Sequence, residues 1–319
     1  MRPLIGFIVL TCLALPTGTT NAQAPAANNP LPLKPKSVRF AVIGDSGTGA
    51  KQQYSVAAQM DRYRTSVAFD FVLMLGDNIY GGKSAADFKR KFEDPYKALL
   101  DAGVKFYASL GNHDDPNERF YKPFNMDGKR YYSFKSGDAQ FFALDSNYMD
   151  DQQLSWITQQ LSGSRATWKI CFFHHPLYSH ARFHGPDVDL RARLEPVLEK
   201  NGVDVVLNGH EHVYERIKPQ RGINYFVLGN AGELRFHDLI PSADTVKGFD
   251  TDQSFMMVEI AGDELYFQTV SRTGETVDSG VLTKQAKRVS STSASLEWPR
   301  SLPAGPPHPR ELTSPVLLR

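Results

Sequence analysis

Six short apolar segments recur along the middle of this 319-residue chain, and each one ends in a polar side chain, usually after a glycine. Continuous apolar runs of this length are typical of strands that are buried on both faces of a sheet. The segments are VRFAVIGD ending at Asp45, FDFVLMLGD at Asp77, VKFYASLGN at Asn112, KICFFHH at His175, VDVVLNGH at His210 and INYFVLGN at Asn230.

Stretches with helical spacing of apolar residues separate these segments, at residues 51–64, 84–100, 150–161 and 187–201. Strands that alternate with helices predict a layered α/β protein. Ligand sites in such sheets lie outside the carboxyl ends of the strands. We therefore expect the polar residues that end the segments to meet at one edge.

Two regions break the alternation and look like β-hairpins, at residues 130–145 and 254–271. Each contains two apolar-rich runs joined by a short turn with glycine and aspartate. Hairpins added to alternating strands and helices indicate an α/β (α+β) fold in which two mixed β-sheets are flanked by helices.

Both ends of the chain differ from the middle. Residues 1–24 carry one charge, a short apolar core and small residues at the end, the pattern of a cleaved signal peptide. Residues 25–36 are proline-rich and predict a linker, and residues 284–319 are rich in serine, proline and arginine and predict a disordered tail. One domain at residues 37–283 remains, with Cys171 as the single cysteine outside the signal peptide.

The formal net charge is only +1, and neither sign of charge dominates. This balance argues against nucleic acid or an anionic membrane as the main partner. The signal peptide predicts export, to the periplasm or the medium, with no stable membrane anchor after cleavage.

The polar residues at the segment ends are metal ligands by type. Carboxylate, amide oxygen and imidazole bind hard and borderline transition metals. Taken alone, each of them is more often a turn residue, a helix cap or a packed side chain. Together they indicate a metal centre, because chance seldom places so many ligand types at successive strand ends: Asp45, Asp77, Asn112, His174, His210 and His212.

The blocks GDSG, GDNIY, GNHD, HHP and GHEH occur in this order and resemble those of the calcineurin-like metallophosphoesterase superfamily. The likeness covers residues 38–216 and continues plausibly to residue 283. It implies a four-layer sandwich. The first block lacks the histidine that most members carry, and the Asp77-x-x-Tyr80 spacing resembles purple acid phosphatases of the small, mammalian type.

This resemblance implies a dinuclear centre. Iron(III) would be held by Asp45, Asp77, Tyr80 and His212. A divalent ion (Fe, Zn or Mn) would be held by Asp77, Asn112, His174 and His210, with Asp77 as the bridge. The family pattern His-x-Pro favours His174 over His175, and an error of one position stays open.

The resemblance also implies two catalytic histidines. His113 is expected to contact phosphate and protonate the leaving group. His184 is expected to be the second histidine, with His180 as the alternative, and an ordinary surface position is open for each. Glu211 is expected either to point away from the metals or to lie behind their ligands, and Tyr214 and Glu215 are expected to support His212.

The implied activity is hydrolysis of small phosphate monoesters by an acid phosphatase, through attack of a metal-bound hydroxide at phosphorus. Iron(III) lowers the pKa of bound water more than a divalent ion does, so activity in mild acid is expected. Two alternatives stay open: a phosphodiesterase or nucleotide pyrophosphatase on the same scaffold, and a non-catalytic binding protein.

Overall fold

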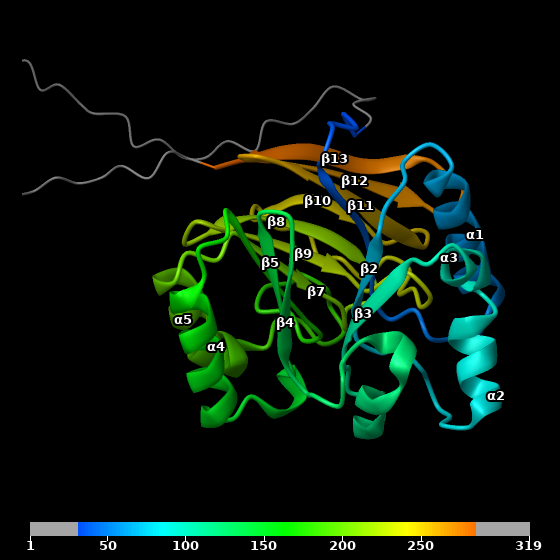
Figure 1. The fold of residues 1–319 in the computed structure, drawn as a ribbon, viewed down its shortest axis with the longest axis horizontal. Coiled ribbons are helices and arrows are strands. Elements are labelled where there is room, and N and C mark those ends of the chain that lie inside the picture. Colours follow the sequence, from blue (N-terminus) through cyan, green and yellow to red (C-terminus); the bar gives the residue numbers. More distant parts are fainter. Residues whose placement is uncertain (1–30, 285–319) are drawn as a thin grey trace, which may run out of the picture. The chain divides into compact units, whose positions relative to one another are not determined.

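The computed structural model describes residues 31–284 (Figure 1). The predicted signal peptide, residues 25–30 of the predicted linker and residues 285–319 of the predicted tail lie outside this range. Within it, no helix combines the length and the apolar character needed to cross a membrane.

The first sheet has six strands in the order β13-β12-β11-β1-β2-β3. Its parallel half is formed by β1 (Val38–Ile43), β2 (Phe71–Leu75) and β3 (Lys105–Ser109). The antiparallel half is formed by β11 (Ser254–Ala261), β12 (Glu264–Ser271) and β13 (Thr276–Thr283). The sheet is therefore mixed, as the sequence predicts.

The second sheet has seven strands in the order β10-β8-β9-β7-β6-β5-β4. Its parallel strands are β5 (Ala139–Ala143), β6 (Trp168–Phe173), β7 (Val205–Asn208) and β9 (Ile223–Leu228). Antiparallel strands complete both edges: β4 (Tyr132–Ser136), β8 (Tyr214–Gln220) and β10 (Thr245–Phe249). All six apolar segments and both hairpins thus form strands where they were predicted.

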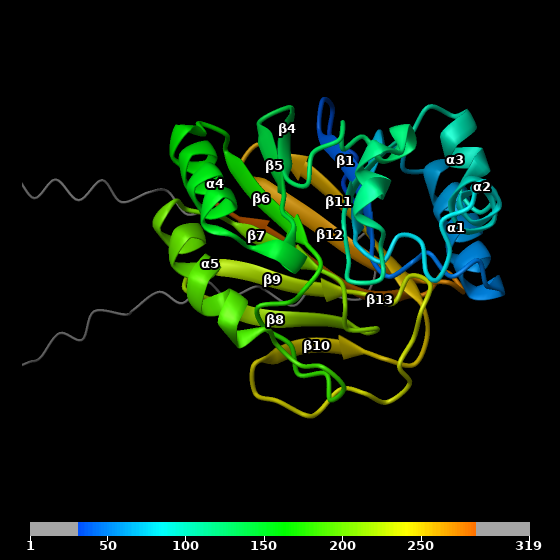
Figure 2. The same ribbon diagram turned by 90° about the horizontal axis from the view of Figure 1, so that it is seen from below.

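Helices lie outside the two sheets (Figure 1, Figure 2). The helices α1 (Lys51–Arg64), α2 (Ala85–Phe88) and α3 (Lys97–Asp101) lie beside the first sheet, and α4 (Asp151–Gly163) and α5 (Val188–Lys200) cover the second. Aromatic rings fill the space between the sheets; the rings of Phe40 and Phe141, for example, lie 5.2 Å apart edge to face. The predicted sandwich of two mixed sheets flanked by helices is confirmed.

The structure differs from the sequence prediction in two respects. The stretch 84–100 is not one helix, because Pro95 has no N–H to donate; a π-helical turn over Lys89–Glu93 separates α2 from α3. The strands β8, β10 and β13 were not predicted. Charged residues interrupt β8, and β10 and β13 are edge strands, of which β10 is largely exposed and β13 is mostly half-buried.

Residues 31–36 of the predicted linker form no helix or strand but contact β11. The backbone N–H groups of Leu33 and Lys34 donate to the buried carboxylate of Glu259, at 2.8 and 2.5 Å. At the other end, Lys284 forms an ion pair with Asp204.

Candidate metal centre

Five parallel strands, β1, β2, β3, β6 and β7, direct their carboxyl ends to one edge of the sandwich. Asp45 and Asp77 follow β1 and β2, Asn112 follows β3, and His174 and His210 follow β6 and β7. The contacts below show that these side chains meet, as expected from the parallel strands.

One half of the cluster is formed around Asp45, Tyr80 and His212. The hydroxyl of Tyr80 lies 3.3 Å from Oδ1 of Asp45 and 3.2 Å from Nε2 of His212. That nitrogen lies 3.4 Å from Oδ1 of Asp45. Ligand atoms of Asp45, Asp77 and His212 lie within 4.8 Å of one another, so a single cation can contact all of them.

The other half is formed by Asn112, His174 and His210. Oδ1 of Asn112 lies 2.9 Å from Nε2 of His174 and 3.0 Å from Nδ1 of His210, and these two nitrogens are 3.1 Å apart. The opposite nitrogen of His174, Nδ1, lies 3.0 Å from the carbonyl oxygen of Leu75 and donates its hydrogen there. Nε2 of His174 therefore presents a lone pair to the cluster, as the amide oxygen of Asn112 does. A neutral His210 has only one ring hydrogen to share between them, so a cation satisfies these acceptor atoms better.

Asp77 lies between the two halves. Its Oδ1 is 3.5 Å from Nε2 of His174, while the same side chain belongs to the group with Asp45 and His212. The backbone N–H of His113 donates to this oxygen at 3.0 Å and fixes the orientation of the carboxylate. Asp77 is thus positioned as a bridge between two ions would be.

The backbone around the cluster explains the glycines that precede the ligand-type residues. Asp45, Asp77 and His210 have φ values of 53°, 52° and 71°, a left-handed conformation that costs free energy at residues other than glycine. A Cβ atom on Gly111 would lie 2.1 Å from Oδ1 of Asp77, and one on Gly209 would lie 2.4 Å from Oδ2 of Asp45. Only glycine permits this close packing of the turns.

Burial perturbs the titration of the cluster. Burial and the charge of Asp77 raise the pKa of Asp45 well above its usual range. Burial and the adjacent His175 lower the pKa of His174 well below its usual range, and burial and Arg235 lower the pKa of His212 to about 4. The imidazoles are therefore in the neutral form that binds metals, and a cation would stabilise the crowded carboxylates. The residues fit a pair of bound cations.

The remaining predicted histidines occupy different surroundings. The ring of His113 lies 5.1 Å from that of Tyr80, and the ring of His184 stacks on His210 at 4.2 Å. Nδ1 of His180 instead lies 2.7 Å from Oε1 of the buried Glu215. Of the two alternatives, His184 is the one beside the cluster.

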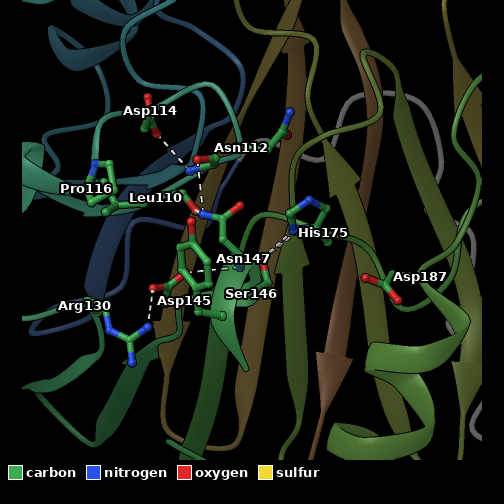
Figure 3. A pocket seen from close by; sticks show the side chains of 12 residues that line it. Leu110, Asn112, Asp114, Pro116, Arg130, Asp145, Ser146, Asn147, His175 and Asp187 are labelled. Carbon is green, nitrogen blue, oxygen red and sulfur yellow. Dashed lines mark hydrogen bonds and ion pairs between the residues drawn. The ribbon is translucent and has the colours of Figure 1, made fainter. Parts of the chain in front are cut away.

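His175, the alternative to His174, lies next to the second half. Its Nδ1 is 2.8 Å from the hydroxyl of Ser146, and its ring lies 4.5 Å from that of His210. It also lines a cleft of about 440 Å³ that includes Asn112 and Ser146 (Figure 3). Nδ1 of His175 thus contacts Ser146, whereas Nε2 of His174 contacts Asn112 and His210 within the cluster.

Three expectations about the residues after His210 can be compared with the structure. Glu211 is buried and faces His184, with 3.6 Å between Oε1 and Nδ1, and burial raises the pKa of Glu211 to about 7. The expectation that Tyr214 and Glu215 support His212 was wrong. Tyr214 donates to Asp278, and Glu215 accepts from His180, because β8 turns these side chains away from the cluster.

Sequence reasoning missed Arg235, which lies in the loop between β9 and β10. Its backbone N–H donates to the carbonyl oxygen of His212 at 3.0 Å. No periodicity or motif marks this residue, so only the fold brings it to the cluster.

Comparisons with known proteins agree with this geometry. The model of the calcineurin-like phosphoesterase family matches residues 38–214. Purple acid phosphatase 4 of Arabidopsis thaliana is 31% identical over 268 residues, which cover 72% of this chain and 78% of that protein. Tartrate-resistant acid phosphatase type 5 of Homo sapiens is 26% identical over 302 residues, which cover 79% and 92%.

Two solved structures share the fold. Purple acid phosphatase PPD1 from yellow lupin (Lupinus luteus) seeds superposes with a TM-score of 0.67 and 20% identity over 80% of this chain and 55% of that one. GAP50, described as the anchor in the inner membrane complex of Plasmodium, has a TM-score of 0.67 and 19% identity over 79% and 90%. With the family match and the 31% identical relative, these findings show that the chain belongs to the calcineurin-like phosphoesterase family, in its purple acid phosphatase branch.

Proposed function

We propose that this protein is a metal-dependent acid phosphatase that hydrolyses small phosphate monoesters. The observation that carries the proposal is the convergence of all seven predicted ligand side chains into two adjacent groups that share Asp77. The names of the related purple and tartrate-resistant acid phosphatases support the same reaction.

In this proposal the two groups hold different ions. Asp45, Asp77, Tyr80 and His212 would hold iron(III), and Asp77, Asn112, His174 and His210 would hold a divalent Fe, Zn or Mn ion. Burial and the charge of Asp45 raise the pKa of Tyr80, so its phenolate requires a strongly charged cation, which favours a trivalent ion there. When bound, such a pair stabilises charge on the phosphate oxygens and makes water a better nucleophile.

His113 and His184 would act on the substrate. His113 is exposed beside Tyr80, and His184 is stacked on His210, so each can donate an N–H hydrogen bond to a phosphate oxygen. We assign leaving-group protonation to this pair, with transfer from a ring nitrogen to the departing ester oxygen. Burial and Arg235 lower the pKa of His184, so its protonated fraction grows only in acid.

The test compares 4-nitrophenyl phosphate with bis(4-nitrophenyl) phosphate, using protein whose metal content has been measured. The proposal predicts a higher kcat/KM for the monoester. A higher value for the diester would move the protein to the phosphodiesterase alternative. Two bound metals without hydrolysis of any phosphate ester would favour a non-catalytic binding protein.

We also propose export, on the basis of the signal-like sequence of residues 1–24. Amino-terminal sequencing of protein recovered from an exporting host should begin just after Ala24. A mature protein that begins near Met1 would contradict export by cleavage.

A further inference from the structure

Arg235 places a positive charge beside the proposed metal centre. Within residues 31–284, no carboxylate forms an ion pair with Arg235, and no residue accepts a hydrogen bond from its terminal NH₂ groups. A guanidinium stays charged at every relevant pH. The carboxylate of Glu211 feels this charge, because Arg235 opposes the rise in its pKa, but it forms no ion pair with the guanidinium. If two metal ions are bound nearby, an additional anion beside Arg235 would be favourable.

The loop that carries Arg235 is fixed to the cluster by its backbone. The N–H of Glu233 donates to the carbonyl oxygen of Asp45 at 3.1 Å, and the N–H of Arg235 donates to that of His212 at 3.0 Å. Both accepting residues are proposed metal ligands, so the position of Arg235 is coupled to the centre before any substrate binds.

The side chain is fixed by stacking. Cζ of Arg235 lies 3.3 Å from the centroid of the Phe183 ring, which lies 4.4 Å from the ring of His184. His184 in turn stacks on His210. Stacking covers one face of the guanidinium and leaves its terminal N–H groups at the edge, the geometry that binds carboxylate and phosphate oxygens.

The cleft that Asn112 and His175 line has no unpaired arginine or lysine among its described lining residues. The one arginine or lysine among them, Arg130, is paired with Asp145 at 3.4 Å (Figure 3). Arg130 also forms an ion pair of 2.9 Å with Asp150. Asp187 also lines this cleft. An anionic group of a substrate is therefore better accommodated beside Arg235 than in this cleft.

We propose that Arg235 binds a second anionic group, a carboxylate or a phosphate, on the part of the substrate that is not transferred. The inference rests on the proposed phosphatase function and narrows its substrate class to phosphate monoesters with an additional negative charge. Phe183 and the loop of Arg235 hold the guanidinium in place for this contact.

The experiment uses metal-loaded protein and three related substrates. Glycerol 3-phosphate has no second anion, 3-phosphoglycerate adds a carboxylate, and glycerol 1,3-bisphosphate adds a phosphate. The readout is the ratio of kcat/KM for each compound with a second anionic group to that for glycerol 3-phosphate, in the wild type and in Arg235→Gln. A change in the shared catalytic machinery cancels in this ratio.

We expect the wild type to prefer at least one of the two compounds with a second anion, and Arg235→Gln to lower that ratio about tenfold to a hundredfold, as for a hydrogen-bonded charge. Which ratio falls tells whether the anion is a carboxylate or a phosphate. The matched control is Arg182→Gln, which removes the same charge from an exposed neighbour of Phe183 and should leave the ratio unchanged.

Equal ratios of kcat/KM in the wild type and Arg235→Gln would overturn the inference. An equal fall of the ratio in Arg182→Gln would also overturn it, because it would indicate a nonspecific effect of positive charge. If the wild type releases no phosphate from these three compounds or from 4-nitrophenyl phosphate, the proposed phosphatase function fails instead. In that case calorimetry measures the binding affinity of each compound, and the ratio of affinities replaces the ratio of kcat/KM. If Arg235→Gln leaves this affinity ratio unchanged, the proposed contact is rejected.

Discussion

Nδ1 of His174 donates a hydrogen bond of 3.0 Å to the carbonyl oxygen of Leu75. Leu75 ends β2 in the first sheet, and His174 follows β6 in the second, so this bond joins the two sheets at the edge where the cluster forms. It fixes the hydrogen on Nδ1 and directs the lone pair of Nε2 toward Asn112 and His210.

The first prediction concerns this histidine. His174→Ala should lose one of two bound metal ions after dialysis, and kcat should fall by more than about 100-fold, because even residues that only orient metal ligands affect affinity by 10–100-fold. Elemental analysis and initial rates measure both effects. The control is His175→Ala, which should keep two ions; the reverse result would assign the ligand to His175.

The second prediction separates two neighbouring histidines. His184→Ala should lower kcat for an alkyl phosphate by about 10²–10⁴-fold with both metals retained. The loss should be smaller for 4-nitrophenyl phosphate, whose leaving group needs no proton.

His180→Ala is the comparison variant. It should keep turnover but lower the free energy of unfolding by about 1–3 kcal/mol, because the buried carboxylate of Glu215 loses its imidazole partner and keeps the hydroxyls of Ser179 and Thr245. Steady-state rates and denaturant unfolding of both variants test this division. Normal turnover in His184→Ala would remove His184 from the mechanism.

The third prediction concerns Gly111. In Gly111→Ala the new methyl group would lie 2.1 Å from Oδ1 of Asp77, so the carboxylate must move. The variant should bind less metal and unfold at a lower temperature. Gly163→Ala is a matched control at the end of α4, where a Cβ meets nothing within 4 Å, and its stability should be unchanged or higher. Full metal content in Gly111→Ala would contradict the close packing.

The fourth prediction concerns pH. Burial and Arg235 lower the pKa of His212 from 6.5 to about 4 in the folded, metal-free protein. Between pH 6.5 and pH 4 the unfolded chain binds more protons at His212 than the folded one. The contribution of His212 to the free energy of unfolding is therefore complete above pH 6.5, and it is lost as the pH falls from 6.5 through about 4. The loss from this side chain is about 3 kcal/mol, since one pKa unit corresponds to about 1.4 kcal/mol.

Denaturant unfolding of chelator-treated protein between pH 7 and pH 4 measures this loss. The His212→Gln variant should show a shallower dependence on pH than the wild type. Identical slopes in the two proteins would show that His212 keeps an ordinary pKa.

The parts of the fold that the sequence predicts are those coded by local patterns. The runs before Asp45 and Asp77 are apolar from Phe40 to Ile43 and from Phe71 to Leu75, because these parts of β1 and β2 are buried on both faces. β8 gives no such signal, since Glu215 and Arg216 interrupt it. These charges can be buried because residues far away in the sequence contact them, His180 and Thr245 at Glu215 and Asp278 at Arg216.

The same limit applies to the candidate site. Asp77 and Tyr80 are found from their spacing and from the blocks around them. Spacing does not distinguish His180 from His184, because only tertiary packing places one ring on His210 and the other on Glu215. Arg235 has no local signal, since its contact with His212 depends on the path of a loop.

Tyr80 contacts Asp45 and His212, and the central claim is that these residues hold iron(III) together. The visible absorption spectrum of the purified, oxidised protein tests this claim most directly. A phenolate bound to iron(III) absorbs visible light by charge transfer. We predict a broad band that is lost in Tyr80→Phe and retained in Tyr54→Phe. Tyr54 lies on α1, and its hydroxyl donates to the carbonyl oxygen of Arg90. A colourless wild-type protein that holds two divalent ions, or a band that persists in Tyr80→Phe, would contradict the assignment of Tyr80 as an iron ligand.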